Sequence, residues 1–172
     1  MSIRIVGCPD KDFTPYVHRA AKFYADCLLS YKMQEKTRII VKFRNDIKEC
    51  GYAYIAGKNA SGKPRKFLIE INSALGAKDI LETIAHEMVH VKQFAYGDMN
   101  EKLSRWHDTS VDTDEIDYWF HPWEIEAHGL ETALLCNFAI NEKLWEVFDD
   151  FRNPEKKIRK RKIKWKKVNS AK

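Results

Sequence analysis

Apolar residues recur at helical spacing between Ile80 and Tyr96, in the stretch ILETIAHEMVHVKQFAY. Positions 80, 81, 84, 85, 88, 89 and 95 are apolar, which predicts a helix that is buried along one side. Asp79 followed by Glu82 is typical of a helix N-cap with its partner, and Gly97 is typical of a helix C-terminus. We therefore predict a largely buried helix here.

Three further segments have helical patterns. The first runs from Thr14 to Met33, with Thr14 as the expected cap and Pro15 in the first turn. The second runs from Pro122 to Ile140, and its Gly129 is expected to permit close packing against the helix over 80–96. The third runs from Asn141 to Phe151 and ends before Pro154.

Short segments rich in β-branched and aromatic residues lie between the predicted helices over 14–33 and 80–96. They are Arg38–Phe43, Gly51–Ala56 and Lys66–Ile71, separated by turn-like residues. These segments predict three strands of a small antiparallel sheet. The fold class is therefore α+β, with a sheet packed on the helix over 80–96 and on further helices. The long connection over residues 97–121 lacks periodicity, and such loops are often functional.

Length and composition restrict the class of protein. The chain has 172 residues, 44% hydrophobic and 12% aromatic, which suits one globular domain. It lacks an apolar run of about 18 residues, so we expect no membrane span. The first residues lack an apolar signal-peptide core, and the four cysteines form no C-x-x-C pair. We expect an intracellular, cytoplasmic protein with reduced thiols and no cysteine-based zinc ribbon.

Charge divides the chain into two parts. Residues 153–172 hold ten Lys and Arg and one acid, whereas residues 1–152 have a net charge of −4. We predict a packed domain over 1–152 and a basic tail over 153–172. One interpretation of the tail is a flexible, solubilising segment. The other is electrostatic contact with nucleic acid through residues 155–167, with Trp165 stacking on a base.

The helix over 80–96 contains His86-Glu87-Met88-Val89-His90, an H-E-x-x-H pattern. Histidines four residues apart project from one face of a helix, where both can hold one zinc ion. Glu87 lies roughly 100° round the helix from His86 and can reach water as a general base. Because buried histidines and a buried glutamate need partners, this pattern predicts a metal site.

A catalytic zinc site usually has a third protein ligand. The candidates are Glu124, Glu126, His107, His121 and His128. Glu124 and His128 lie one turn apart on one face of the predicted helix, and Glu126 points about 200° away from Glu124. Only one of the two glutamates is therefore expected to face the metal.

The H-E-x-x-H pattern is followed some 30 residues later by a predicted helix with E-x-x-A-[D/H]. Together these two motifs resemble the gluzincin branch of the zinc metallopeptidases. They are also similar to small phage and bacterial proteins with H-E-x-x-H-x-x-Q and a later P-x-E-x-E-A. Here these stretches are His86–Gln93 and Pro122–His128. The resemblance implies Glu124 as the third ligand, with His128 where gluzincins place a supporting aspartate. This departure keeps Glu126 and His128 as alternative ligands.

The size and layout also resemble SprT-like metallopeptidase domains, which generally use a third histidine. Some SprT-like enzymes cleave proteins crosslinked to DNA. Together with the basic tail, this resemblance implies a protease that acts on proteins bound to nucleic acid.

The expected function is zinc-dependent hydrolysis of a peptide or protein substrate. Glu87 would activate the zinc-bound water, and Tyr118, His107 or His121 would stabilise the oxyanion. An extended substrate would lie along an exposed strand edge, for which Lys66–Ile71 is the nearest segment. The alternatives are a nucleic-acid-binding protein whose zincin-like domain is structural or inactive, and another zinc-dependent amide hydrolase.

Overall fold

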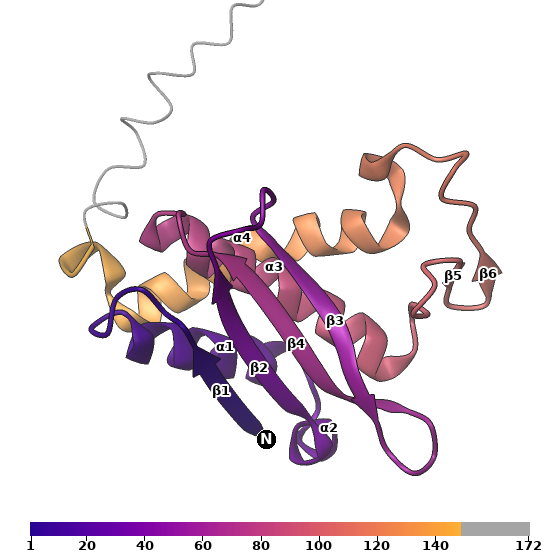
Figure 1. The fold of residues 1–172 in the computed structure, drawn as a ribbon, viewed down its shortest axis with the longest axis horizontal. Helices are drawn as coiled ribbons and strands as arrows, with labels where there is room; N and C mark the ends of the chain where they lie inside the picture. Colours follow the sequence, from indigo (N-terminus) through magenta and orange to yellow (C-terminus); the bar gives the residue numbers. More distant parts are fainter. Residues whose placement is uncertain (149–172) are drawn as a thin grey trace, which may run out of the picture.

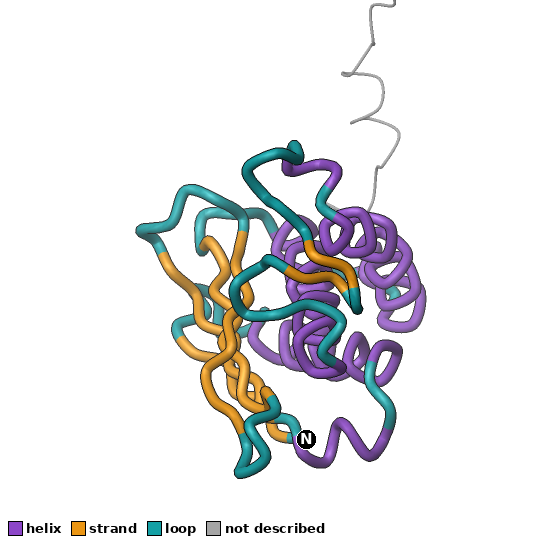
Figure 2. Tube along the Cα trace, turned by 90° about the vertical axis from the view of Figure 1, so that its right-hand side faces the viewer, coloured by secondary structure: helices purple, strands orange, loops and turns teal. Residues whose placement is uncertain are grey.

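The computed structural model describes residues 1–148, which form a small α+β domain with a mixed sheet. Strands and helices form separate layers, and the helices cover one face of the sheet (Figures 1 and 2). The predicted basic tail over 153–172, and residues 149–151 of the last predicted helix, lie outside the described residues.

The sheet contains β1 (Ser2–Val6), β2 (Arg38–Arg44), β3 (Gly51–Lys58) and β4 (Pro64–Asn72), in the order β1-β2-β4-β3. β1 is parallel to β2 and β2 is parallel to β4, so the prediction of an antiparallel sheet is correct only for β3 and β4. Short turns reverse the chain twice between β2 and β4. β2 and β4 therefore run in the same direction. They pair with each other because β4, rather than β3, lies next to β2 in the sheet.

The expected substrate edge was assigned to the wrong strand. The segment Lys66–Ile71 belongs to β4, which is paired on both sides, and β3 forms the edge. The alternating residues Phe67, Ile69 and Ile71 are fully buried beneath the helices, which suits an interior strand. β1 was missed, although Ile3 and Ile5 alternate with polar residues.

The helices are α1 (Thr14–Leu28), α2 (Tyr31–Lys36), α3 (Ala77–Tyr96) and α4 (Pro122–Glu142). The predicted helix Thr14–Met33 is interrupted because Leu29 has an extended backbone, with φ −117° and ψ 133°. Phe13, rather than Thr14, holds the N-cap position of α1.

Two other helix predictions need correction. Gly129 in α4 is exposed, and a Cβ atom there would meet nothing within 4 Å, so it does not serve close packing. Of the helix predicted over Asn141–Phe151, residues 141–142 belong to the end of α4, and the described part after them contains only a short 3-10 helix, η2 (Leu144–Glu146).

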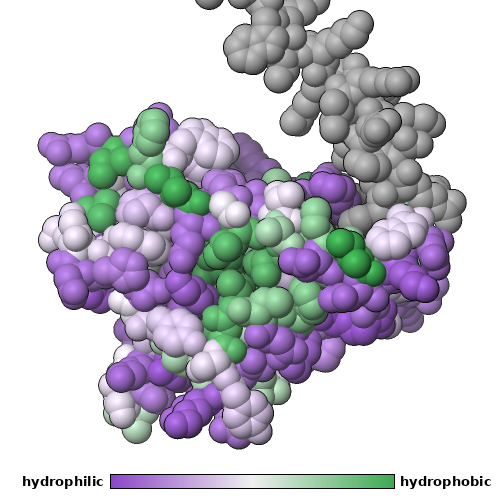
Figure 3. Space-filling model, turned by 180° about the vertical axis from the view of Figure 1, so that it is seen from behind, coloured by the Kyte–Doolittle hydropathy of each residue, from purple (hydrophilic) through white to green (hydrophobic). Residues whose placement is uncertain are grey.

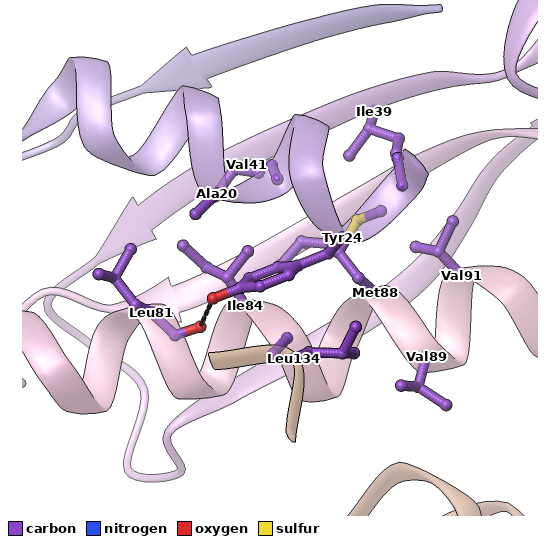
Figure 4. Packing of buried hydrophobic residues seen from close by; sticks show 14 of the residues in the cluster. Ala20, Tyr24, Ile39, Val41, Leu81, Ile84, Met88, Val89, Val91 and Leu134 are labelled. Atoms are coloured by element: carbon purple, nitrogen blue, oxygen red, sulfur yellow. Dashed lines mark hydrogen bonds between the residues drawn. The ribbon is translucent and has the colours of Figure 1, made fainter. Parts of the chain in front are cut away.

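The core lies between the sheet and the helices, and Tyr24 of α1 is buried in it. Tyr24 is fully buried, and its hydroxyl donates a hydrogen bond to the Leu81 carbonyl of α3 at 3.2 Å (Figure 4). Ile39 and Val41 of β2 contribute to the same cluster. This packing fixes α3 against the sheet and so positions the H-E-x-x-H residues.

The connection between α3 and α4 lies mostly at the surface, although Met99 within it is buried in the core. Residues 97–121 contain a short hairpin, β5 (Arg105–Trp106) with β6 (Thr109–Ser110), and the 3-10 helix η1 (Tyr118–Phe120).

The helical side of the molecule shows hydrophobic side chains among hydrophilic ones (Figure 3). Within residues 1–148, no helix combines the length and apolar character needed to cross a membrane. All four cysteines are free thiols.

Candidate metal centre

α3 carries the H-E-x-x-H residues along its buried length. It begins at Ala77 after Gly76, so Asp79 lies in its first turn and is not the predicted cap. It ends as predicted at Gly97, whose left-handed backbone (φ 82°) brings its N–H to the Gln93 and Phe94 carbonyls. Between these ends, His90 is buried and His86 is nearly so, both toward α4.

Three ligand atoms converge between α3 and α4. The Nε2 atoms of His86 and His90 lie 3.1 Å apart. Glu124 places Oε2 3.2 Å from His86 Nε2 and Oε1 3.6 Å from His90 Nε2. Ligands about 2.0–2.1 Å from a tetrahedral zinc are separated by roughly 3.3–3.4 Å. The spacing of these donor atoms therefore fits one zinc ion, and they form a candidate metal-binding group.

Hydrogen bonds on the far side of each imidazole fix which nitrogen carries the lone pair. His86 Nδ1 lies 2.7 Å from Glu131 Oε2, and His90 Nδ1 lies 2.7 Å from Gln93 Oε1. Both partners accept, so both Nδ1 atoms donate, and each Nε2 atom presents a lone pair when its ring is neutral. Such outer partners typically orient metal-bound histidines.

The orientation of the Gln93 amide is itself determined by its contacts. Its Nε2 donates to the Trp123 carbonyl at 2.9 Å and to Glu126 Oε2 at 3.0 Å. The amide oxygen must therefore be the atom that faces His90. As a result, two imidazole lone pairs and a carboxylate face one another, and this arrangement requires a cation between them.

The acidic surroundings favour a positive charge at this point. Burial lowers the pKa of His86, but hydrogen bonds to Glu124 and Glu131 outweigh it and raise that pKa to about 10. Burial raises the pKa of Glu124, but hydrogen bonds to His86 and His90 outweigh it and bring the pKa well below its usual range. A proton on His86 and a metal ion are thus the two cations that satisfy this group.

Glu87 lies next to this group but outside it. It is 5% exposed, and burial raises the pKa of its carboxyl to about 7 against the opposing effect of the nearby His90 and His86. It lines the same cleft as the three candidate ligands. Glu87 therefore has the location expected of a general base that does not bind the metal.

The cleft has a volume of about 960 Å³ and runs between α3 and the edge strand β3. Its lining includes residues 49–55, the candidate ligands, Tyr118 and His128. Gly51 permits the close approach of β3 to α3, because a Cβ atom there would lie 2.7 Å from Thr83 Cγ2. The candidate metal centre thus opens onto an exposed strand edge.

The other predicted site residues have different positions. Glu126 accepts hydrogen bonds from Lys92 at 2.8 Å and from Gln93, so it supports the site from outside. His128 Nδ1 lies 3.1 Å from Glu131 Oε1, and these two residues form a second candidate metal group with His86. The Tyr118 hydroxyl donates to Glu124 Oε2 at 2.8 Å.

The remaining histidine candidates do not join the group. His107 Nδ1 lies 3.6 Å from Asp98 Oδ1, and its side chain is 56% exposed. His121 Nε2 lies 3.1 Å from the Ile116 carbonyl. Within residues 1–148, neither belongs to a candidate metal group.

Glu131 and Gln93 contact the histidines directly but were not predicted as site residues from the sequence. Glu131 lies seven residues, or about two turns, after Glu124 and so shares its helix face. Gln93 lies three residues after His90, within reach of its ring. Helical spacing makes both residues candidates but does not choose between Glu131 and His128, and in the structure Glu131 takes the supporting position expected for His128.

No family model, curated protein or solved structure matches the chain. The arrangement of side chains is therefore the basis for assigning a function.

Proposed function

We propose that the chain is a zinc-dependent metallopeptidase. One observation carries the proposal: His86 Nε2, His90 Nε2 and the Glu124 carboxylate converge within 3.1–3.6 Å beside Glu87 in an open cleft. Two histidines and a glutamate form a known ligand set of hydrolytic zinc. Other divalent metals that bind histidine and carboxylate ligands would fit the same donors, so the test below measures which metal is bound.

Bound zinc would supply Lewis acidity, which polarises a substrate carbonyl and makes water more acidic. Glu87 would take the proton from the attacking water and return it to the leaving amine. The Tyr118 hydroxyl, which donates to Glu124, would hold the ligand carboxylate in place. As the cleft-lining tyrosine nearest the ligands, Tyr118 also remains our candidate for an oxyanion donor.

The edge strand β3 supports a peptide as the substrate. β3 pairs with β4 on one side, and the cleft lies along its residues 51–55. The unpaired backbone groups of an edge strand bind an extended chain by adding a further strand. A peptide bound in this way would pass the candidate metal centre and Glu87.

The test compares the wild type with Glu87→Gln, His86→Ala and His90→Ala. We expect about one zinc per chain in the wild type and in Glu87→Gln, and loss of zinc in both alanine variants. Cleavage of a proteome-derived peptide library should fall by about 100-fold or more in Glu87→Gln, because a general base contributes roughly 10²–10⁴. Purification of a metal-free wild type after growth in metal-replete medium would refute the proposal.

A further inference from the structure

The sheet face opposite the helices is open within the described residues. Figure 2 shows the strands as an outer layer, with the helices on their other side. We define the open sheet face by the residues of β1–β4 that point away from the helices. They include Arg4, Arg38, Ile40, Lys42, Arg44, Tyr52, Tyr54, Lys66, Leu68 and Glu70, together with the uncharged Ser2, Val6 and Asn72.

Strand register places these side chains in rows across the sheet. Arg38 is paired with Lys66, and Arg4 lies in register with Ile40. Ile40 continues through Leu68 to Tyr54, and Lys42 continues through Glu70 to Tyr52. Residues paired across adjacent strands share a face, so basic, apolar and aromatic side chains form one continuous surface.

The charge on this surface is strongly basic. Within β1–β4 its only acid is Glu70, which is shared by Arg44 at 2.7 Å and Lys42 at 3.9 Å. From the loop after β2, Asp46 pairs with Arg44 and Glu49 hydrogen-bonds to Tyr52. Arg4, Arg38 and Lys66 are exposed and form no ion pair with residues 1–148. Three cations therefore remain available to a partner, although the packed domain as a whole is mildly acidic.

The tyrosines supply a second kind of contact. The rings of Tyr52 and Tyr54 lie 5.9 Å apart with a 34° angle between their planes, and Tyr54 is 44% exposed. Both also line the cleft beside β3, so they lie where the open sheet face meets the candidate active site. Aromatic rings beside a basic groove are the usual platform for stacking unpaired bases.

We propose that the open sheet face binds single-stranded nucleic acid. Arg4, Arg38 and Lys66 contact phosphates, and Tyr54 stacks on a base. A four-stranded sheet is too broad to enter the groove of a duplex, which admits a helix or a two-stranded ribbon, and paired bases do not reach the tyrosine rings. A four-stranded sheet with aromatic residues is wide enough to stack two or three bases. This proposal is independent of the proposed peptidase function.

The charge test uses the full chain and a fluorescein-labelled single strand of about twelve thymidines, within the usual site size. Arg38→Gln with Lys66→Gln is compared with Lys11→Gln and Lys32→Gln, two exposed lysines outside the sheet that form no ion pair within residues 1–148. Losing two phosphate contacts should reduce the slope of log K against log[salt] by about 1.4. The control pair, which has the same net charge, should retain the wild-type slope. Because every variant retains residues 149–172, any contribution from them cancels.

The stacking test changes Tyr54 alone. Tyr54→Ala should weaken binding about tenfold, whereas Tyr54→Phe retains the ring and should stay within about twofold of the wild type. Ultraviolet crosslinking followed by peptide mapping should identify Tyr54 in β3. Thermal melting of each variant establishes that it is folded.

Three results would overturn the proposal. The first is crosslinking confined to residues 155–167, which would assign all binding to the basic tail. The second is an equal reduction of the salt slope in the Arg38/Lys66 double variant and in the control double variant, which would indicate an effect of net charge alone. The third is binding of phosphatidylserine vesicles, but not of the oligonucleotide, with the same dependence on Arg38 and Lys66.

Discussion

The Glu131 carboxylate lies 2.7 Å from Nδ1 of His86 and so determines which nitrogen of that imidazole faces Glu124. Its other oxygen lies 3.1 Å from His128 Nδ1. The rings of His128 and His86 also lie 4.6 Å apart, so His128 contacts His86 both directly and through Glu131. We infer that this chain of contacts stabilises the ligand geometry before a metal binds.

Replacing Glu131 should weaken zinc binding without removing a ligand. Loss of an outer partner of this kind typically lowers metal affinity about 10–100-fold, and we expect this range for Glu131→Ala. Glu131→Gln should have a smaller effect, because its amide oxygen still accepts from His86. Chelator competition measures the affinity.

Glu142→Gln is the matched control, because Glu142 lies on the same helix but pairs with Arg19. It should retain wild-type affinity. Equal affinities for Glu131→Ala and this control would show that Glu131 has no role in metal binding.

Glu124 and Glu126 provide a direct comparison of two neighbouring carboxylates. Glu124→Ala removes a candidate ligand and should weaken zinc binding by more than the roughly 100-fold typical of an outer partner. Glu126→Ala should stay within about tenfold of the wild type, because Gln93 retains the Trp123 carbonyl and Lys92 retains Asp98 at 2.9 Å. Metal content and affinity are measured for both. A greater loss of zinc affinity in Glu126→Ala than in Glu124→Ala would identify Glu126 as the ligand.

Sequence periodicity predicted the parts of the site that depend on one helix. The ends of α3 and α4 lie close to their expected positions, and the 200° between Glu124 and Glu126 separates a candidate ligand from a supporting residue. The order of the strands could not be obtained in this way. Short turns give strand direction, but the position of β4 between β2 and β3 depends on pairing between strands that are not consecutive in the sequence.

The supporting contacts were harder to predict for a related reason. The sequence motif places His128 at the supporting position, four residues after Glu124, whereas Glu131 reaches His86 from one turn further along α4. Both side chains contact His86, and which of them forms its hydrogen bond depends on how α4 crosses α3. That relationship is tertiary and has no local signal.

Metal removal should lower the thermal stability of the wild type. A ligand at 100 times its dissociation constant stabilises the folded state by about 2.7 kcal/mol, which corresponds to a shift of roughly 5–10 °C for a domain of this size. Differential scanning calorimetry with zinc and with a chelator measures the shift. His90→Ala should show the same Tm in both conditions. A zinc-dependent shift that persists in His90→Ala would indicate binding elsewhere.

Gly129→Ala should stabilise the protein. Gly129 lies in the interior of α4, where glycine costs about 0.5–1 kcal/mol relative to alanine. The added methyl group would meet nothing within 4 Å, so it introduces no clash to offset this gain. Urea denaturation of the chelated protein should show a higher midpoint with an unchanged m-value. Gly51→Ala is the contrasting variant, because its methyl group would lie 2.7 Å from Thr83 Cγ2 and should destabilise the fold. A lower midpoint for Gly129→Ala would mean that α4 requires glycine at this position for a partner or a motion.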